Sequence, residues 1–371
     1  MLLTGIVAEY NPFHTGHMYH IEKAKRETDA DGIIAIMSGS FVQRGEPGVY
    51  DKWTRALHAI KGGVDLVLEL PAVYALSSAE GFAKGAVETL KATGVCSTLS
   101  FGSECGDASL LRRAAFLLET EPPAFRSALQ MALKAGHSYA AARKIALSEV
   151  DREAASVLTS PNNILASAYL RFWDGDVHSV KREGADYLDT EPKGKFASAL
   201  ALREKLYRGE DISSFVPYET DGLSAVHLLD YAALLLYALR TGADKKPPSV
   251  PETVWKRLVK QDGTSVESVL ENAKTKQIHM SSIKRAWMQL LIQNDVPQNT
   301  KPSYIRVLGF NGRGAEILKQ MKKTATLPII TRPAAFKEDC PIWETEKRAT
   351  DIYFMPKGLV NQDLKRAPIQ I

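Results

Sequence analysis

Two histidines, His14 and His17, stand in the stretch EYNPFHTGH (residues 9–17), directly after the apolar run LLTGIVA (residues 2–8). Gly16 between them lets the backbone turn tightly, and His17 falls in the first turn of the predicted helix that follows. A helix N-terminus at the carboxyl end of a parallel strand attracts anions through its N–H groups. Two imidazoles there can donate hydrogen bonds to a triphosphate, and more strongly to the charge that develops when its α-phosphate is transferred. The residue types and their spacing therefore indicate nucleotide chemistry.

Two other interpretations of these histidines remain open at this point. The chain contains no GxxxxGK[ST] sequence, so a P-loop is excluded as the phosphate cradle. A histidine pair in a loop can be purely structural. His14, His17 and His20 also follow a three-residue spacing, but that spacing drifts around a helix and Glu9 is the only nearby carboxylate. We therefore expect no metal site formed by the protein.

Basic and amide side chains elsewhere could serve the same chemistry. Lys52 and Arg55 fall on one face of a predicted helix, where they could counter phosphates or simply face solvent. Asn162 and Asn163, at a predicted helix start, could read a nucleotide through their amide groups, or cap that helix. Arg182 ends another predicted strand, where a guanidinium can grip a phosphate with two hydrogen bonds or form a surface salt bridge.

Short apolar segments alternate with helical patterns through the first half of the chain. The predicted strands are residues 2–8, 32–38, 65–71, 97–103 and 177–184, and the predicted helices are roughly 15–29, 48–62, 79–93, a longer helical region over 107–173, and 195–208. Continuously apolar strands that alternate with helices predict an α/β fold with a doubly wound parallel sheet. Open sheets of this kind bind ligands at the carboxyl ends of their strands, which is where the two histidines stand.

The second half of the chain has a different character. Residues 223–295 are predicted to be mostly helical, with a break at TGADKKPPSVP (241–251), and residues 304–331 predict a small strand–helix–strand unit. We therefore expect two domains, one over residues 1–222 that contains the sheet and a mainly helical, basic one over residues 223–371.

Charge is unevenly distributed between these parts. Residues 241–371 hold 22 Lys and Arg against 13 Asp and Glu, a net charge of +9, whereas residues 1–240 hold 25 against 30, a net charge of −5. A basic C-terminal part suggests a polyanionic partner. A lysine-rich surface that merely keeps the protein soluble is the alternative.

The overall composition is that of a globular protein, with 45% apolar and 24% charged residues. No uninterrupted apolar run of membrane-spanning length occurs, and the start MLLTGIVAEYNPF lacks the basic region of a signal peptide. Cys96, Cys105 and Cys340 form no CxxC pair, which argues against a cysteine-based zinc site and is typical of a reducing compartment. We expect a cytoplasmic protein that makes no membrane contact.

The first motif, GIVAEYNPFHTGH, strongly resembles that of the HxGH nucleotidyltransferase superfamily, whose members transfer AMP from ATP. Eight ordered blocks over about 350 residues resemble the bacterial tRNA(Met) cytidine acetate ligase family. They are GIVAEYNPFHTGH, MSGSFVQRGEPGVYDKWTRA, GVDLVLELPAVYALSSAEGFAKGAV, FGSE, SPNNIL, VKREGADY, YIRVLGFN and RATDIY. This resemblance implies a ligase that activates acetate with ATP to acetyl-adenylate. It then implies acetylation of N4 of the wobble cytidine of elongator tRNA(Met), which gives N4-acetylcytidine.

The resemblance also implies roles for particular parts of the chain. Residues 1–222 would form the ATP-binding, HxGH nucleotidyltransferase-like catalytic domain, and residues 223–371 would bind tRNA. His14 and His17 would be catalytic. The implied ATP-binding residues are Val7, Ala8, Glu9, Tyr10, Asn11, Pro12, Phe13, His14, Thr15, Gly16, His17, His20, Gly102, Asn162, Asn163 and Arg182.

Other candidates concern acetate and RNA. Ser40, Gln43 and Arg44 lie in SGSFVQRGEP (38–47), after the second strand, and are candidates for holding acetate or the target cytidine. Ser40 stands where this family usually has Asn. The candidates for tRNA binding are Lys274, Lys276, Lys284 and Arg285.

The expected reaction needs few further components. Mg²⁺ is expected to accompany the ATP phosphates because of their charge, no covalent nucleophile is required because an acyl-adenylate is already activated, and no protein partner is inferred. Two alternatives are a small-molecule adenylyltransferase with the same HxGH core and a non-catalytic protein that binds nucleotide or RNA. The basic C-terminal part favours a macromolecular substrate over the first, and the intact HTGH and VKREG sequences argue against the second.

Overall fold

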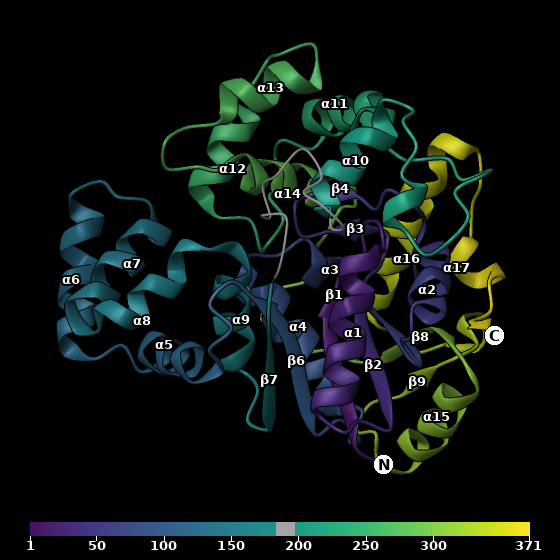
Figure 1. Cartoon of the computed structure of the whole chain (residues 1–371). Coiled ribbons are helices and arrows are strands. Elements are labelled where there is room, and N and C mark those ends of the chain that lie inside the picture. Colours follow the sequence, from purple (N-terminus) through teal and green to yellow (C-terminus); the bar gives the residue numbers. More distant parts are fainter. Residues whose placement is uncertain (183–196, 298) are drawn as a thin grey trace.

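The computed structural model describes residues 1–182, 197–297 and 299–371. Its centre is a sheet with the strand order β10-β8-β5-β2-β1-β6-β7, and a short strand β9 pairs with β8 (Figure 1). The strands are β1 Leu3–Ala8, β2 Gly32–Ser38, β5 Leu66–Leu70, β6 Thr98–Ser103, β7 Asp176–Lys181, β8 Ile305–Phe310, β9 Ile329–Ile330 and β10 Ile369–Gln370. The strands predicted from the first half of the chain are thus confirmed within the described residues, and residues 183 and 184 of the last predicted strand lie outside them.

Five neighbouring strands, β5, β2, β1, β6 and β7, run parallel. β8 runs antiparallel to β5, so the sheet is mixed at this edge rather than wholly parallel. The predicted α/β class is confirmed.

Both faces of the sheet are covered, which explains why its strands are continuously apolar. On one face, Ile33 and Val67 pack with residues of α1 Thr15–Glu27 and α2 Lys52–Lys61. On the other face, Ile34 and Leu66 pack with residues of α4 Ala79–Ala92 and α15 Gly312–Thr324. Successive residues of a strand point to opposite faces, so both sets must be apolar when helices cover both sides.

A short hairpin precedes the helix that was expected over residues 48–62, and this helix begins later than expected. β3 Phe41–Val42 and β4 Glu46–Pro47 pair antiparallel after β2. α2 therefore begins only at Lys52, where the Asp51 carboxylate accepts hydrogen bonds from the main-chain N–H groups of Trp53 and Thr54. Asp51 is a favourable N-cap residue for this reason.

Two groups of helices flank the sheet (Figure 1). The first group is α5 Ala108–Thr120, α6 Pro123–Lys134, α7 Tyr139–Val150, α8 Arg152–Ser156 and α9 Pro161–Leu170. Within it, α6 and α7 lie farthest from the sheet. The second group is α10 Ala199–Tyr207, α11 Ala232–Thr241, α12 Glu252–Val259, α13 Val266–Ala273 and α14 Met280–Leu291. Among the described residues no helix combines the length and apolar character needed to cross a bilayer.

The predicted strand–helix–strand unit is present as β8, α15 and β9, but it does not stand apart from the N-terminal half. β8 pairs with β5 of the main sheet. The core of the second helical group likewise includes Phe41 and Trp53 beside Trp287. β5 would otherwise be an open edge, and β8 covers it. A boundary at residue 222 therefore does not divide the protein into two separate cores.

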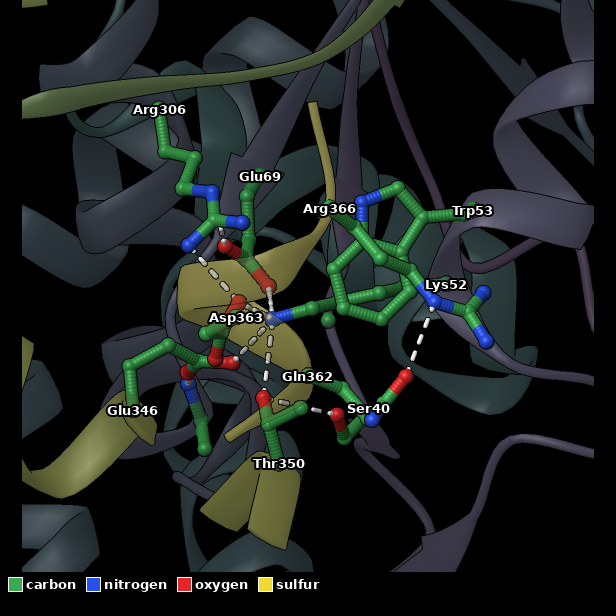
Figure 2. Close-up of polar contacts among 12 residues, drawn as sticks. Ser40, Lys52, Trp53, Glu69, Arg306, Glu346, Thr350, Gln362, Asp363 and Arg366 are labelled. Atoms are coloured by element: carbon green, nitrogen blue, oxygen red, sulfur yellow. Dashed lines mark hydrogen bonds and ion pairs between the residues drawn. The ribbon is translucent and has the colours of Figure 1, made fainter. Parts of the chain in front are cut away.

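Residues of the N-terminal part and of the C-terminal part also meet in a buried cluster of charges (Figure 2). Lys52 is fully buried, and its Nζ lies 2.5 Å from Glu69 Oε1, 3.2 Å from Glu346 Oε1 and 2.9 Å from Asp363 Oδ1. Arg306 of β8 adds a second cation, 2.7 Å from the Asp363 carboxylate. Glu346 and Asp363 belong to α16 Pro341–Phe354 and α17 Gln362–Lys365. The expectation that Lys52 counters phosphates or faces solvent is wrong, because C-terminal carboxylates enclose it.

Candidate active site at the carboxyl end of the sheet

A pocket lies at the carboxyl ends of β1, β6 and β7, beside the first turns of α1. Its lining includes most of the predicted ATP-binding residues, namely Val7, Ala8, Glu9, Tyr10, Asn11, His14, Gly16, His17, His20, Gly102, Asn162 and Arg182. Gln43 and Arg44 of the β3–β4 hairpin also line it. The sheet topology thus gathers residues from distant parts of the sequence at one edge, as open parallel sheets do.

His14 and His17 form a stacked pair at the start of α1. Their ring centroids are 3.7 Å apart, and the rings are inclined by 27°. His14 is the N-cap residue, and its Nδ1 accepts a hydrogen bond from Gly16 N (3.1 Å). Nδ1 of His17 accepts in turn from His14 N (3.2 Å). Since both Nδ1 atoms are acceptors, a neutral ring at either position carries its proton on Nε2.

The environment keeps both rings neutral. Burial, with the nearby positive charges of Arg182 and Arg203, lowers the pKa of His14 to about 3. Burial and the neighbouring His14 ring also lower the pKa of His17 well below its usual value. Two stacked imidazoles avoid like-charge repulsion only when at least one is neutral. The pair therefore presents two neutral Nε2–H donors.

The sequence predicted that main-chain N–H groups at the start of α1 attract an anion, but two of these groups already donate hydrogen bonds within the motif. Gly16 N donates to the His14 ring, and His17 N donates to His14 O (2.9 Å). Neither N–H group is available to a phosphate. The Nε2–H groups of His14 and His17 are therefore the imidazole donors that this helix start offers to an anion.

Charged side chains hold the segment between β1 and α1 in place. Arg55, which is fully buried, donates to the main-chain oxygens of Glu9 (2.7 Å) and Ser38 (3.0 Å), and so ties together the ends of β1 and β2. Arg203 of α10 donates to Asn11 O (2.7 Å). The expectation that Arg55 faces phosphate or solvent is wrong, because its donors are used by main-chain carbonyl groups.

The β3–β4 hairpin is attached to the same segment. The carboxylate of Glu9 accepts a hydrogen bond from Gln43 N (2.6 Å). Burial raises the pKa of Glu9, while Arg203, Arg44 and Arg55 act in the opposite direction. Gln43 and Arg44 therefore lie where the sequence predicted, next to the histidine motif.

Ser40 does not lie in the pocket. It is fully buried, with its Oγ 3.3 Å from Thr350 Oγ1, beside the charge cluster of Figure 2. The candidate role of Ser40 in holding acetate or cytidine is therefore wrong. Successive residues of an extended segment point to opposite sides. The sequence alone did not reveal that α16 covers the side on which the Ser40 hydroxyl lies.

Asn162 and Asn163 form a reciprocal clamp with Glu104, which follows β6. The Glu104 carboxylate accepts from Asn162 N (3.2 Å), Asn162 Nδ2 (2.7 Å) and Asn163 N (2.9 Å). Asn163 Oδ1 accepts in return from Glu104 N (2.9 Å). Glu104 thus caps α9, whereas the Ser160 side chain forms no capping hydrogen bond. Asn162 lines the pocket and Asn163 does not.

Gly102 of β6 pairs with Val180 of β7, and Arg182 directly follows the end of β7. A Cβ atom on Gly102 would come no closer than 3.7 Å to another heavy atom, that of Arg182 Cγ. A Cβ atom at this position would therefore make ordinary van der Waals contact with Arg182 and Val180. Arg182 N donates to Ser103 O (2.9 Å), which continues the β6–β7 pairing to the last described residue before residue 197.

Three other predicted ATP-binding residues do not line the pocket, namely Pro12, Phe13 and Thr15. Phe13 is fully buried and packs against Tyr10 and His17, with ring centroids 4.9 and 5.5 Å apart. It supports the histidine from behind. Arg203 is a lining residue that the sequence did not single out. The sequence pattern gives no signal for Arg203, because its contact with Asn11 depends on how α10 packs against the loop after β1.

The four predicted tRNA-binding residues fall into two pairs. Lys274 and Lys276 are exposed in the loop between α13 and α14. Lys284 forms an ion pair with Glu46 (2.5 Å), and Arg285 donates to Gln43 O (3.1 Å). Burial lowers the pKa of Arg285 to about 10. Lys284 and Arg285 therefore hold the back of the β3–β4 hairpin.

The described residues contain no group of three or more His, Cys, Asp or Glu side chains that could hold a metal ion. Glu9 is the single carboxylate among the described lining residues, and it already accepts a hydrogen bond from Gln43 N. This donor set does not fit a resident magnesium ion, which prefers several oxygen ligands.

Known proteins resemble this chain over its whole length. A family model described as HIGH nucleotidyl transferase matches residues 1–367. A tRNA(Met) cytidine acetate ligase from Thermoanaerobacter sp. (strain X514) is 38% identical over 95% of both chains. One from Caldicellulosiruptor saccharolyticus is 40% identical over 95% of this chain and 94% of its own.

Two crystal structures of Thermotoga maritima TmcAL are similar in fold. The apo form has a TM-score of 0.92, and the form bound with alpha-thio ATP has a TM-score of 0.89. Each is 34% identical in sequence and is covered completely, as is this chain. The chain therefore belongs to the HIGH nucleotidyl transferases and, among them, to the tRNA(Met) cytidine acetate ligase family.

Proposed function

We propose that the protein activates acetate with ATP and transfers the acetyl group to N4 of the wobble cytidine of elongator tRNA(Met). The observation that carries this proposal is the stacked His14–His17 pair at the start of α1, with both Nδ1 atoms engaged. The name shared by the relatives indicates acetate and the cytidine of tRNA(Met) as substrates.

The geometry suits the first half-reaction, the formation of acetyl-adenylate. An acetate oxygen attacks the α-phosphorus of ATP, and pyrophosphate leaves. Negative charge grows on the α-phosphate oxygens during this step, and the Nε2–H groups of His14 and His17 are placed to donate to them. α1 has no acidic residue in its first turn, so its N-terminal dipole also favours the anion. Arg182, which also lines the pocket, supplies a guanidinium for the other phosphates.

We further propose that acetate binds near Gln43 and Arg44, which line the pocket on the hairpin next to Glu9. A carboxylate substrate needs a cation or amide donors, and both are present there. Mg²⁺ would enter with ATP and be held by its phosphates, because the lining residues offer it too few oxygen ligands.

The second half-reaction needs an RNA surface. Lys274 and Lys276 are exposed, and no described acidic side chain pairs with them. The adjoining Gln277 donates from Nε2 to Gly136 O (2.5 Å), in the turn between α6 and α7. Exposed Lys134 lies two residues before that glycine. We name Lys134, Lys274 and Lys276 the basic rim, and propose that it binds tRNA phosphates. A tRNA substrate also supports a cytoplasmic location.

The direct test is incubation with ATP, isotopically labelled acetate and bulk bacterial tRNA, followed by nucleoside analysis. We expect label in N4-acetylcytidine and none without ATP. Pyrophosphate release that depends on a phosphomonoester instead of acetate would favour a small-molecule adenylyltransferase. Absence of any acetate-dependent exchange of pyrophosphate into ATP would overturn the proposed function.

A further inference from the structure

A segment without acidic residues runs through α6 and α7 of the first helical group. Residues 122–148 contain Arg126, Lys134, Arg143 and Lys144 but no Asp or Glu, although the whole chain has 43 acidic residues among 371. This acid-free segment carries a charge of +4 within an N-terminal part whose net charge is −5. No residue of α6 or α7 lines the pocket. The binding of ATP therefore does not account for this concentration of positive charge.

Tyr139, the first residue of α7, is an exposed aromatic side chain in this segment. The residue is 56% exposed, and Arg143, one turn later, lies over its ring with the guanidinium carbon 5.7 Å from the ring centroid. Such a position is typical of a cation–π contact. Arg143 Nε is buried without a hydrogen-bond partner, and no described carboxylate pairs with the guanidinium. We name Tyr139 and Arg143 the aromatic platform, a ring that is backed by an uncompensated cation.

The aromatic platform adjoins the basic rim. Tyr139 lies three residues after Gly136, whose oxygen accepts the hydrogen bond from Gln277 of the loop between α13 and α14. The acid-free segment and the loop that carries two lysines of the basic rim therefore meet at this contact. The same helical group also reaches the pocket, because its last helix, α9, supplies Asn162 to the lining.

An unpaired nucleobase with its phosphates matches this combination of groups. Every base has a face that can stack on an aromatic ring, and lysine and arginine side chains contact the phosphates. A target cytidine must leave the stack of its loop to enter a pocket, so the neighbouring bases lose a stacking partner that an aromatic side chain can replace. A duplex would offer phosphates but no free base face. An acidic protein surface would use the cations but not the ring.

We propose that the ring of Tyr139 stacks on an unpaired base of the anticodon loop, while Arg143 and the basic rim contact the adjoining phosphates. The helical group α5 to α9 then binds tRNA together with residues of the C-terminal part. The proposal rests on the tRNA substrate of the proposed function, and it goes further by naming a platform and the kind of nucleotide that the platform holds.

Fluorescence anisotropy with two labelled RNAs tests the aromatic platform without depending on turnover. One RNA is a hairpin with the anticodon loop of elongator tRNA(Met), and the other is a blunt duplex with the same stem. We expect Tyr139→Ala to weaken binding of the hairpin about tenfold, the effect of losing one stacked base, and to leave binding of the duplex unchanged. Tyr139→Phe should bind like the wild type, because stacking needs the ring and not the hydroxyl. Tyr139→Leu should bind as weakly as Tyr139→Ala.

The dependence on salt separates stacking from charge. Tyr139→Ala should lower the affinity by the same factor at about 50 and 200 mM salt, since a neutral ring releases no counterions, whereas Arg143→Met should flatten the dependence. Phe116→Ala is the matched control, because Phe116 is a 66% exposed aromatic residue on α5, outside the acid-free segment. This variant should bind both RNAs like the wild type. Circular dichroism checks that each variant is folded.

Two results would overturn the aromatic platform. One is wild-type affinity of Tyr139→Ala for the hairpin, which would leave the exposed ring to a protein contact. The other is an equal loss of affinity for the hairpin and the duplex, which would mean that no unpaired base is held. Wild-type protein that binds neither RNA would contradict the proposed function as well.

Discussion

The ring of His14 lies 3.7 Å from that of His17, and the main-chain N–H of His14 donates to Nδ1 of His17. The first residue of the motif thus sets the tautomer of the last. The backbone of the motif also fixes both tautomers. Because each Nδ1 atom accepts a main-chain hydrogen bond, each neutral ring carries its proton on Nε2 and can donate from there.

His17→Ala should lower acetate-dependent exchange of pyrophosphate into ATP by about 10²–10³-fold, since one donor to the transition state is lost. The fold should be retained, because Phe13 and Tyr10 remain packed behind the site. His137→Ala, at an exposed position, serves as the control and should leave the exchange unchanged. Exchange by His17→Ala within threefold of wild type would remove this residue from the mechanism.

Arg182→Ala should raise the KM for ATP more than it lowers kcat. A guanidinium that grips a phosphate already acts in the ground state, and such binding is reflected mainly in KM. Steady-state kinetics of the exchange reaction measure both constants. An unchanged KM in a folded variant would remove the Arg182 side chain from ATP binding.

Lys52→Met should lower the free energy of unfolding by about 3–5 kcal/mol, because it leaves the carboxylates of Glu69, Glu346 and Asp363 with one cation, Arg306. Lys61→Met on the same helix is the matched control. Lys61 is exposed, so the effect should stay within about 0.5 kcal/mol. Denaturant unfolding measures both. A small effect at Lys52 would mean that the cluster relaxes or takes up a proton.

A chain truncated at residue 222 should not fold. It would lose β8, which pairs with β5, and three of the charged partners of the Lys52 cluster. Circular dichroism and unfolding curves of the fragment test this. A cooperative, folded fragment that retains pyrophosphate exchange would show that the N-terminal part is independent after all.

Stability should fall as the solution becomes more acidic than about pH 6.5. The pKa values of His14, His20 and His58 are lowered to about 3, 4 and 4 by burial. Between these values and about 6.5 the unfolded chain binds more protons than the folded chain, so stability is present above this window and lost as the pH falls through it. Denaturant unfolding from about pH 7.5 to about pH 4.5 measures the slope. Histidines that titrate near pH 6.5 in the folded protein would contradict the expectation.

Lys274→Glu with Lys276→Glu should weaken tRNA binding and flatten its dependence on salt between about 50 and 200 mM, while sparing pyrophosphate exchange. Lys322→Glu with Lys323→Glu, exposed on α15 below the sheet, forms the control pair (Figure 1). Lys284→Glu with Arg285→Glu should impair both half-reactions, because these residues hold the hairpin that carries Gln43. If the Lys284→Glu and Arg285→Glu variant lost only tRNA binding, these two residues would belong to the RNA-binding surface instead.

Local patterns determined much of this protein. The apolar periodicity of the strands and helices, which depends only on near neighbours along the chain, predicted the α/β fold. The strand–loop–helix sequence likewise placed His14, His17 and His20 at one edge of the sheet, because parallel strands bring their carboxyl ends together.

Only the tertiary structure decided which partner each polar side chain meets. Lys52, Arg55 and Ser40 look like surface or pocket residues in sequence, yet all three are fully buried. Lys284 and Arg285 look like an RNA-binding pair, yet they hold the β3–β4 hairpin. His20 of α1 lies within hydrogen-bonding distance of Ser100 of β6, which in turn contacts His178 of β7. A repeating pattern records which face of an element is buried, but a hydrogen bond or an ion pair depends on which distant segment packs against that face, and no local spacing contains that information.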